Sequence, residues 1–150
     1  MEITGQSNLN AAMLDAVARA ALGKATCGVS VGGGSSRIHL MNHNLPEQQR
    51  ASDLLNQFGT LSHTADLTSM KVGEADPVVR CADERIAADS QLAYLLLRDD
   101  EVIAQGKLAV IAGQASLTLS ALDVGLHDVF LYQLAGHFAS GSLRIRVDAP

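Results

Sequence analysis

The feature of this sequence that most constrains its fold is an alternation of apolar and polar residues between Gln91 and Val147. In the clearest stretches every second residue is apolar: Leu117, Leu119, Leu143, Ile145 and Val147. Thr118, Arg144 and Arg146 stand between them. Because successive side chains of a strand point to opposite faces, this pattern predicts strands with one face in a core and one toward water. The block predicts a mainly β protein built as an antiparallel β-sandwich.

Short turns containing aspartate or glycine separate the strands expected in this block. These strands cover Gln91 to Arg98, Glu101 to Ala112, Ala115 to Ser120, Leu126 to Leu134 and Ser142 to Val147. The first is strongly apolar, as expected for a central strand covered on both faces. Such regular spacing favours a sandwich over alternating βαβ units. Jelly-roll and immunoglobulin-like topologies both fit the pattern, so the choice between them stays open.

One helix is predicted, over Asn10 to Gly23, with Asn8 or Asn10 as its cap. Its expected apolar face consists of Leu9, Met13, Val17 and either Ala20 or Ala21. Asp15 and Arg19 are four residues apart in the order that favours an ion pair on a helix surface. An amphipathic helix at this place can cover one end of the sandwich or dock on a neighbour.

Three more strands are expected before Gln91: Cys27 to Val31 and Arg37 to Met41 after the helix, and Val78 to Cys81 after an irregular region. The glycine run at 32–34 lacks the Lys-Ser/Thr of a phosphate-binding loop, so a hairpin turn is expected there. The pattern is irregular over 42–77. Pro46 could open a short helix, or 54–61 could form an edge strand, and 62–77 is expected to be an exposed loop.

The length of 150 residues and the apolar content of 47% predict one domain with a packed core. We expect an N-terminal segment and helix over 1–24 and a β-sandwich over 25–150 that includes the irregular 42–77 region. A net charge of −5, with only Lys24, Lys71 and Lys107 as lysines, argues against a nucleic-acid partner. The scattered arginines and the lack of a long apolar run argue against a membrane partner.

The histidines and cysteines give no motif for a metal, a cofactor or a nucleophile. The histidines are His39, His43, His63, His127 and His137, and neither HExxH nor CxxC accompanies them. Cys27 and Cys81 have apolar neighbours, and no secretory signal is visible, so both are interpreted as free packing thiols. A single bridge between them remains an alternative.

The remaining polar candidates have equally ordinary interpretations. Ser140 follows His137 closely, but the glycine spacing of a nucleophile elbow is missing. The acidic clusters Asp83-Glu84 and Asp99-Asp100-Glu101 fall at expected turns, where solvated carboxylates are common. A calcium site or a glycosidase pair would need carboxylates that converge from separate loops. We therefore predict no catalytic residue, no metal ligand and no cofactor.

Several short segments occur in a familiar order. They are the run 10–16 (NAAMLDA), the run 37–40 (RIHL), Pro46, the pair 54–55 (LL), the run 94–97 (YLLL), the run 106–108 (GKL) and the run 117–119 (LTL). This order resembles that of small tailed-phage virion proteins, in which an N-terminal helix precedes a β-sandwich. The resemblance covers most of the chain, although each segment is short.

The resemblance implies a non-enzymatic virion protein, assembled in the host cytoplasm, that cements or decorates the capsid. Its implied partners are the major capsid protein or other virion proteins, and it is expected to act as a homo-oligomer. The N-terminal segment and the 62–77 loop are the parts expected to be held by neighbours. A tail or neck component is the alternative within the same system. A calcium- or carbohydrate-binding β-sandwich is the alternative of another class.

Overall fold

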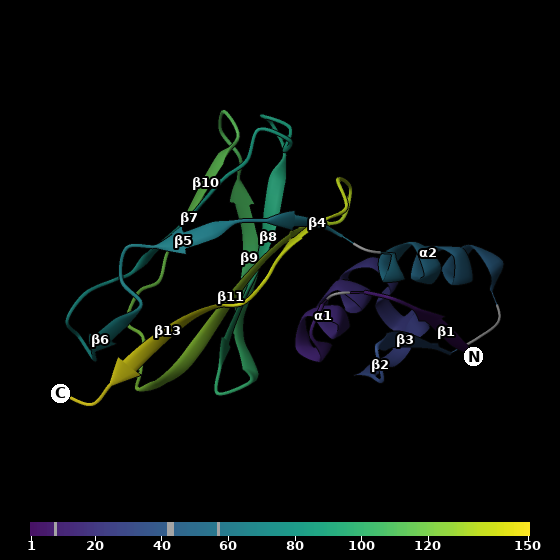
Figure 1. The fold of residues 1–150 in the computed structure, drawn as a ribbon, viewed down its shortest axis with the longest axis horizontal. Helices are drawn as coiled ribbons and strands as arrows, with labels where there is room; N and C mark the ends of the chain where they lie inside the picture. Colours follow the sequence, from purple (N-terminus) through teal and green to yellow (C-terminus); the bar gives the residue numbers. More distant parts are fainter. Residues whose placement is uncertain (8, 42–43, 57) are drawn as a thin grey trace. The chain divides into compact units, whose positions relative to one another are not determined.

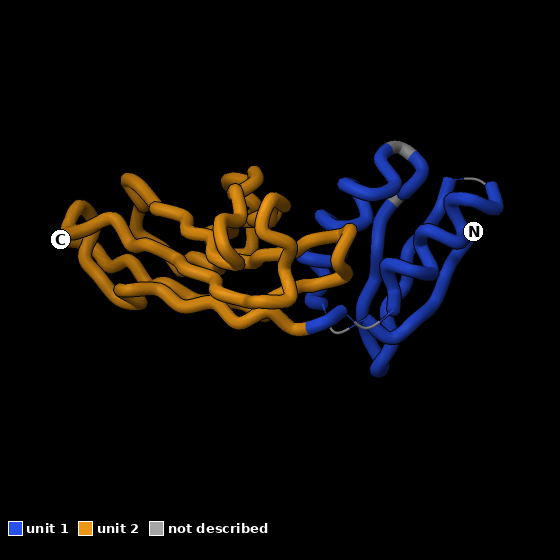
Figure 2. Tube along the Cα trace, turned by 90° about the horizontal axis from the view of Figure 1, so that it is seen from above, with its two compact units in different colours: residues 1–59 blue, residues 60–150 orange. Residues whose placement is uncertain are grey.

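The computed structural model describes residues 1–7, 9–41, 44–56 and 58–150, with their side chains except those of Lys24 and Cys27. The described chain is mainly β, and most of its strand pairs are antiparallel, as the sequence predicts. Its contacts divide it into two compact units, residues 1–59 and residues 60–150 (Figure 2). Within the described ranges, no helix has both the length and the apolar character needed to cross a membrane.

The first unit contains the predicted N-terminal helix, α1 (Ala11–Leu22). Asn10 caps it, because the Asn10 Oδ1 accepts a hydrogen bond from the amide of Met13 at 2.8 Å. Asp15 and Arg19 form the expected ion pair, with 2.9 Å between the carboxylate oxygen and Nε. The short 3₁₀ turn η1 (Gly23–Ala25) follows the helix.

The buried face of α1 differs partly from the expected one. Its buried residues are Met13, Leu14, Val17, Ala18 and Leu22. Leu9, just before the helix, is buried as expected, whereas Ala20 is exposed. The apolar stripe is therefore rotated toward Ala18 and Leu22, because the larger leucine takes the inner position in place of the small alanine.

The sheet of the first unit has the order β1-β3-β2, with β1 at Glu2–Gly5, β2 at Thr26–Gly32 and β3 at Ser35–Leu40. The glycine run forms the expected hairpin turn between β2 and β3. Gly33 and Gly34 have φ values of 60° and 76°, a region that glycine enters without steric cost. β1 was not expected, and it pairs antiparallel with β3 so that Ile3 lies opposite Ile38.

A second helix, α2 (Leu45–Leu55), completes the first unit, where the sequence predicted one helix and left this segment open. The side chain of Asn44 accepts a hydrogen bond from the Glu47 amide at 3.3 Å, and Pro46 lies in the first turn. α2 contacts β1, β3 and α1. A Cβ atom on Gly5 would lie 2.5 Å from the Cβ of Leu55, so only glycine fits where β1 passes α2.

The second unit is built from strands, most of which are labelled in Figure 1. They are β4 (Gly59–Leu61), β5 (His63–Ala65), β6 (Ser69–Lys71), β7 (Val78–Ala82), β8 (Gln91–Arg98), β9 (Glu101–Ala109), β10 (Gln114–Thr118), β11 (Gly125–Gln133), β12 (Phe138–Ser140) and β13 (Leu143–Asp148). β4 begins at the last residue of the first unit. The expected strands 91–98, 101–112, 115–120, 126–134 and 142–147 correspond to β8, β9, β10, β11 and β13.

These strands form two sheets whose order identifies the topology. One sheet has the order β10-β7-β5. In the other, β11 lies between β8 and β13, β9 pairs with β8, and β6 pairs parallel with β13. Taken in chain order, these are strands A, B and E of an immunoglobulin-like sandwich on one side and strands C′, C, F and G on the other. The second unit is therefore an immunoglobulin-like sandwich.

The core of the sandwich consists of two clusters, each with residues from both sheets. The first contains Met70, Val79, Leu96, Leu119, Leu122, Val129, Ile145 and Val147. The second contains Leu61, Cys81, Ile86, Leu92, Val110, Ala115 and Leu131. Inward residues of β11 thus contact both clusters, as expected for the central strand of its sheet.

Two expectations about the first half of the chain need correction. The sandwich was expected to include 25–41, but β2 and β3 pair with β1 in the first unit, because the β1 segment supplies the partner strand. The 62–77 segment was expected to be an exposed loop. It contains β5 and β6, which pair with β7 and β13. Parts of the N-terminal segment and of 62–77 therefore pair through backbone hydrogen bonds within this chain.

Candidate functional site

The histidines that the sequence analysis considered have local structural contacts. His39 lies in β3, with its Nδ1 3.6 Å from a carboxylate oxygen of Glu2. His63 lies in β5, and its Nε2 is 2.9 Å from the carbonyl oxygen of Val129. His137 lies in the turn before β12, and His43 is outside the described residues. Among the described residues, no group of three or more metal-binding side chains comes together.

His127 is the exception, because it is completely buried in the sandwich at 0% exposure. In β11 it faces the same side as Val129 and Leu131, which belong to the two core clusters. Neither ring nitrogen has a hydrogen bond of good geometry within the described structure. Burial lowers the pKa of His127, and weak interactions with the backbone of Gly125 and Ile145 only partly oppose it. The ring is therefore a neutral core group at neutral pH.

Ser140 and Cys81 also serve the interior. The Ser140 hydroxyl accepts a hydrogen bond from the amide of Leu131 and donates one to the carbonyl of Gly141, both at 2.8 Å. Cys81 is a free thiol in the second core cluster, and the Cys27 side chain lies outside the description. Burial, aided by the charge of Asp83, raises the pKa of the Cys81 thiol. A raised pKa keeps the thiol protonated and poorly nucleophilic.

The first acidic cluster forms a clamp at the end of β7. The Asp83 carboxylate accepts hydrogen bonds from Nη2, Nε and the amide of Arg85 at 2.6, 3.0 and 2.9 Å. The Arg85 guanidinium also donates to the carbonyl of Thr60 at 2.6 Å and lies 4.9 Å from the ring centre of Phe138. These contacts join three chain segments. Glu84 lies beside them in the same turn.

Replacing Arg85 with glutamine is expected to raise the pKa of Asp83. Hydrogen bonds from the Arg85 side chain, followed by its amide, lower this pKa from 3.8 to about 2. Because the pKa of Asp83 is lower in the folded state, the pair stabilises the fold at pH values above the pKa of the unfolded chain. This contribution is lost as the pH falls through the pKa of the folded state. Carboxyl-carbon NMR titration should give a value much closer to 3.8 in R85Q. Arg80→Gln makes the same change in β7, just before Cys81, and is the control. It should leave the pKa of Asp83 near 2.

The second acidic cluster makes a tight turn between β8 and β9. Asp99 and Asp100 have φ values of 48° and 69°, which short polar side chains tolerate better than most. Oδ1 of Asp99 accepts a hydrogen bond from the Leu126 amide at 3.1 Å. Glu101 begins β9. The cluster therefore forms the turn of a hairpin, as predicted from the sequence.

One ion pair with a buried carboxylate was not considered from the sequence. Asp128 of β11 is 5% exposed, and its carboxylate accepts hydrogen bonds from Ser142 at 2.6 Å and from Arg144 Nε at 3.1 Å. Burial alone would raise the pKa of Asp128. The hydrogen bonds from Arg144 and Ser142 outweigh it, so the pKa is lowered. An aspartate in an otherwise apolar strand was the available signal, and the arginine in the alternating last strand was its partner.

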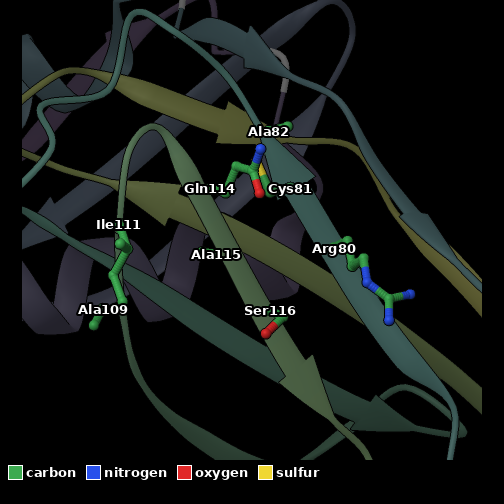
Figure 3. Close-up of a pocket in the computed structure, with 8 residues that line it drawn as sticks. All are labelled: Arg80, Cys81, Ala82, Ala109, Ile111, Gln114, Ala115 and Ser116. Atoms are coloured by element: carbon green, nitrogen blue, oxygen red, sulfur yellow. The ribbon is translucent and has the colours of Figure 1, made fainter.

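An open site of the second unit lies where β9 and β10 separate. Ile111 and Gln114 exchange backbone hydrogen bonds at 2.9 and 3.0 Å, so the two strands begin as a hairpin. After this pair, β9 joins β8 in one sheet and β10 joins β7 in the other. A hollow of about 590 Å³ lies at this fork, and Figure 3 shows its lining. The lining residues are Arg80, Cys81, Ala82, Ala109, Ile111, Gln114, Ala115 and Ser116.

The side chains at the hollow combine one cation with small and apolar groups. Arg80 is exposed, and it makes no ion pair or hydrogen bond with any side chain that the structure describes. Its neighbours in register are Thr64 and Ser116, which carry hydroxyl groups on the same outer face. Ile111 is 74% exposed at the other side of the hollow. Such a site suits an apolar group next to an anionic one.

Comparisons with known proteins add little to this description. No protein-family model matches the chain, and no curated protein matches it. Among solved structures, "crystal structure of CHIR-AB1" is similar at a TM-score of 0.39 and 10% sequence identity. That match covers 61% of this chain and 96% of the other. Strand order alone identifies the fold of the second unit.

Proposed function

We infer that this chain is a non-enzymatic structural protein of a tailed-phage virion, which cements or decorates the capsid by joining neighbouring subunits. The observation that carries the proposal is the open side of the sandwich, where the edges of β9 and β10 both face outward. An edge strand presents unpaired backbone groups, and proteins use such edges to add strands from other chains. The order of short sequence segments, which resembles that of small virion proteins, is the reason for placing the chain in a virion.

The polar groups of the described structure are consistent with a scaffold. The Asp83–Arg85 clamp joins the end of β7 to the carbonyl of Thr60. The Asp128–Arg144 pair joins β11 to β13. These polar groups thus make structural contacts, while the strand edges and the hollow are directed to solvent. A protein that joins capsid subunits would bind them through these strand edges and this hollow.

Mass spectrometry of purified particles tests the proposal. Particles of the phage that encodes the chain should be separated into capsids and tails, and the chain should be found in the capsid fraction at a fixed ratio to the major capsid protein. Recovery in the tail fraction would instead support the tail or neck alternative. Absence from both fractions would contradict a virion role.

A further inference from the structure

The strand order of the smaller sheet lacks a strand beside β10. In an immunoglobulin-like sandwich the sheet that contains strands A, B and E continues with strand D, which pairs with E. Here the corresponding sheet ends at β10 within the described chain. The position of strand D is therefore vacant in this part of the structure, and the hollow lies at the same edge.

The backbone hydrogen bonds of β10 show which groups face that position. The Gly113 carbonyl accepts a hydrogen bond from the Asp83 amide at 2.8 Å, and the Leu119 amide donates one to the carbonyl of Pro77 at 2.8 Å. The backbone amides and carbonyls of the odd-numbered residues therefore point toward β7. Gln114 faces the opposite way, toward Ile111. Because backbone groups alternate along a strand, the amides and carbonyls of Ser116 and Thr118 point away from β7. They form a ready template for another strand.

The neighbouring edge, β9, is less suitable for strand addition. Leu96 pairs with Ala104 and Leu97 pairs with Val102, so Ile103 is an extra residue that forms a bulge. Lys107 lies further along the same strand. Bulges and lysines are devices that protect edges from pairing. The edge of β10 has neither feature between Gln114 and Thr118.

We propose that the outer edge of β10 binds an extended segment of a partner protein, which adds to the sheet in the place of strand D. This inference rests on the proposed function for its setting and names the contact through which joining occurs. The segment pairs its backbone with Ser116 and Thr118. Its inward side chains are small or apolar and contact Ala109 and Ile111, and an acidic side chain on its outer face pairs with Arg80.

The charge of the site supports an acidic occupant. Arg80 is exposed beside the hollow as a cation without an ion-pair partner among the described residues. A carboxylate beside it would gain a charge-assisted hydrogen bond that the chain itself does not provide. A strand with lysine at that position would be repelled. The preference for an acidic segment therefore gives the edge its selectivity.

The test uses a soluble nine-residue peptide that alternates valine with glutamate, titrated into the ¹⁵N-labelled full chain. Amide shifts should change at Ser116 and Thr118, and the peptide should bind at least about tenfold more weakly to Ser116→Pro. Proline removes the outward amide at a position where an edge strand tolerates it. Ser116→Ala keeps that amide and is the matched control, with unchanged affinity expected.

Two further measurements separate the parts of the proposal. Arg80→Gln should weaken the glutamate peptide and leave a valine–glutamine peptide unaffected. A glutamate peptide with alternate backbone nitrogens methylated should not bind the unaltered chain, which tests pairing even where Ser116→Pro unfolds. Absence of binding, shifts confined to β9, or equal affinity for the methylated peptide would overturn the proposal.

A second copy of the chain is the other occupant that the test must identify. Sedimentation that shows a dimer in the unaltered chain and a monomer in Ser116→Pro would assign the edge to self-association, and would overturn the assignment to a partner protein. A monomer in both supports it. Because these measurements do not involve particles, strand addition can fail while the chain is still found in capsids, and the reverse also holds.

Discussion

Replacement of Leu131 by alanine is expected to lower the free energy of unfolding by about 2–5 kcal/mol, the range for large-to-small changes at well-packed core positions. Leu131 is 1% exposed and lies in the second core cluster, on the central strand β11. Its loss removes apolar contacts with residues from both sheets and leaves a cavity between them. Since single domains have about 5–15 kcal/mol in total, this is a large fraction. Urea denaturation followed by circular dichroism measures it.

The same strand offers a matched control. Leu126 also lies in β11 but is 39% exposed. Leu126→Ala makes the same chemical change on the surface and should alter stability by less than about 1 kcal/mol. Equal losses for the two variants would show that Leu131 does not lie in a packed core, and would contradict the arrangement of the sheets.

The second large effect is a loss of stability in mild acid. His127 is fully buried without a well-formed hydrogen bond, and burial lowers its pKa. His63 is partly buried and hydrogen-bonded to the Val129 carbonyl, and burial lowers its pKa as well. Protonating either ring in the folded state places a charge inside the sandwich. The unfolded chain accepts the same protons freely.

The sign follows from proton binding. Where the unfolded state binds more protons than the folded state, the free energy of unfolding rises with pH. With folded pKa values below the unfolded value of 6.5, stability is fully present above that value and falls as pH drops below it. Each fully suppressed histidine contributes a slope of at most about 1.4 kcal/mol per pH unit.

Urea denaturation from about pH 7 to about pH 5 measures this slope. The charges that act on His127 are those of Arg98, which lowers its pKa, and Asp99, which raises it. His127→Leu removes the titrating group and should flatten the dependence, and the double variant with His63→Leu should flatten it further. Leu126→Ala changes no titrating group and should keep the full slope. An unchanged slope in His127→Leu would show that this ring is not buried as described.

The strands of the second unit could be predicted closely because their signal is local. The alternation around Ile145 and the apolar run ending at Arg98 each fix a strand without reference to any other segment. The aspartates and glycines between strands mark the turns for the same reason. The helix α1 has its own capping residue, Asn10, and its own ion pair. Sequence periodicity is sufficient for elements of this kind.

The elements that could not be predicted depend on distant partners. β1 contains four residues, and its pairing with β3 joins Glu2 to His39. β6 contains three residues and pairs with β13, so that Met70 lies beside Val147. Segments this short carry no periodicity, and only the finished sheet determines them. The 42–77 region therefore looked irregular in sequence, with a helix from Pro46 only one of two alternatives and 62–77 expected as a loop, although it contains α2 and several strands.

The candidate site shows the same limit. Local sequence identified the acidic clusters as turns, and the structure confirms this for Asp83 and Asp99. It could not show that His127 is buried, because alternation would place the neighbouring Leu126 inside and the imidazole outside, whereas Leu126 is the exposed residue. Nor could it find the edge at Ser116. That edge exists because β9 and β10 part into different sheets, which is a property of the topology.

Hydrogen–deuterium exchange at β10 tests whether a partner strand covers this edge in the particle. The free chain and purified virions should be exchanged in parallel and analysed by mass spectrometry of the segment that contains Ser116 and Thr118. Their outward amides have no backbone partner in the described chain, so fast exchange is expected in the free protein. Strong protection of this segment is expected in the particle. Equal exchange in the two samples would contradict it.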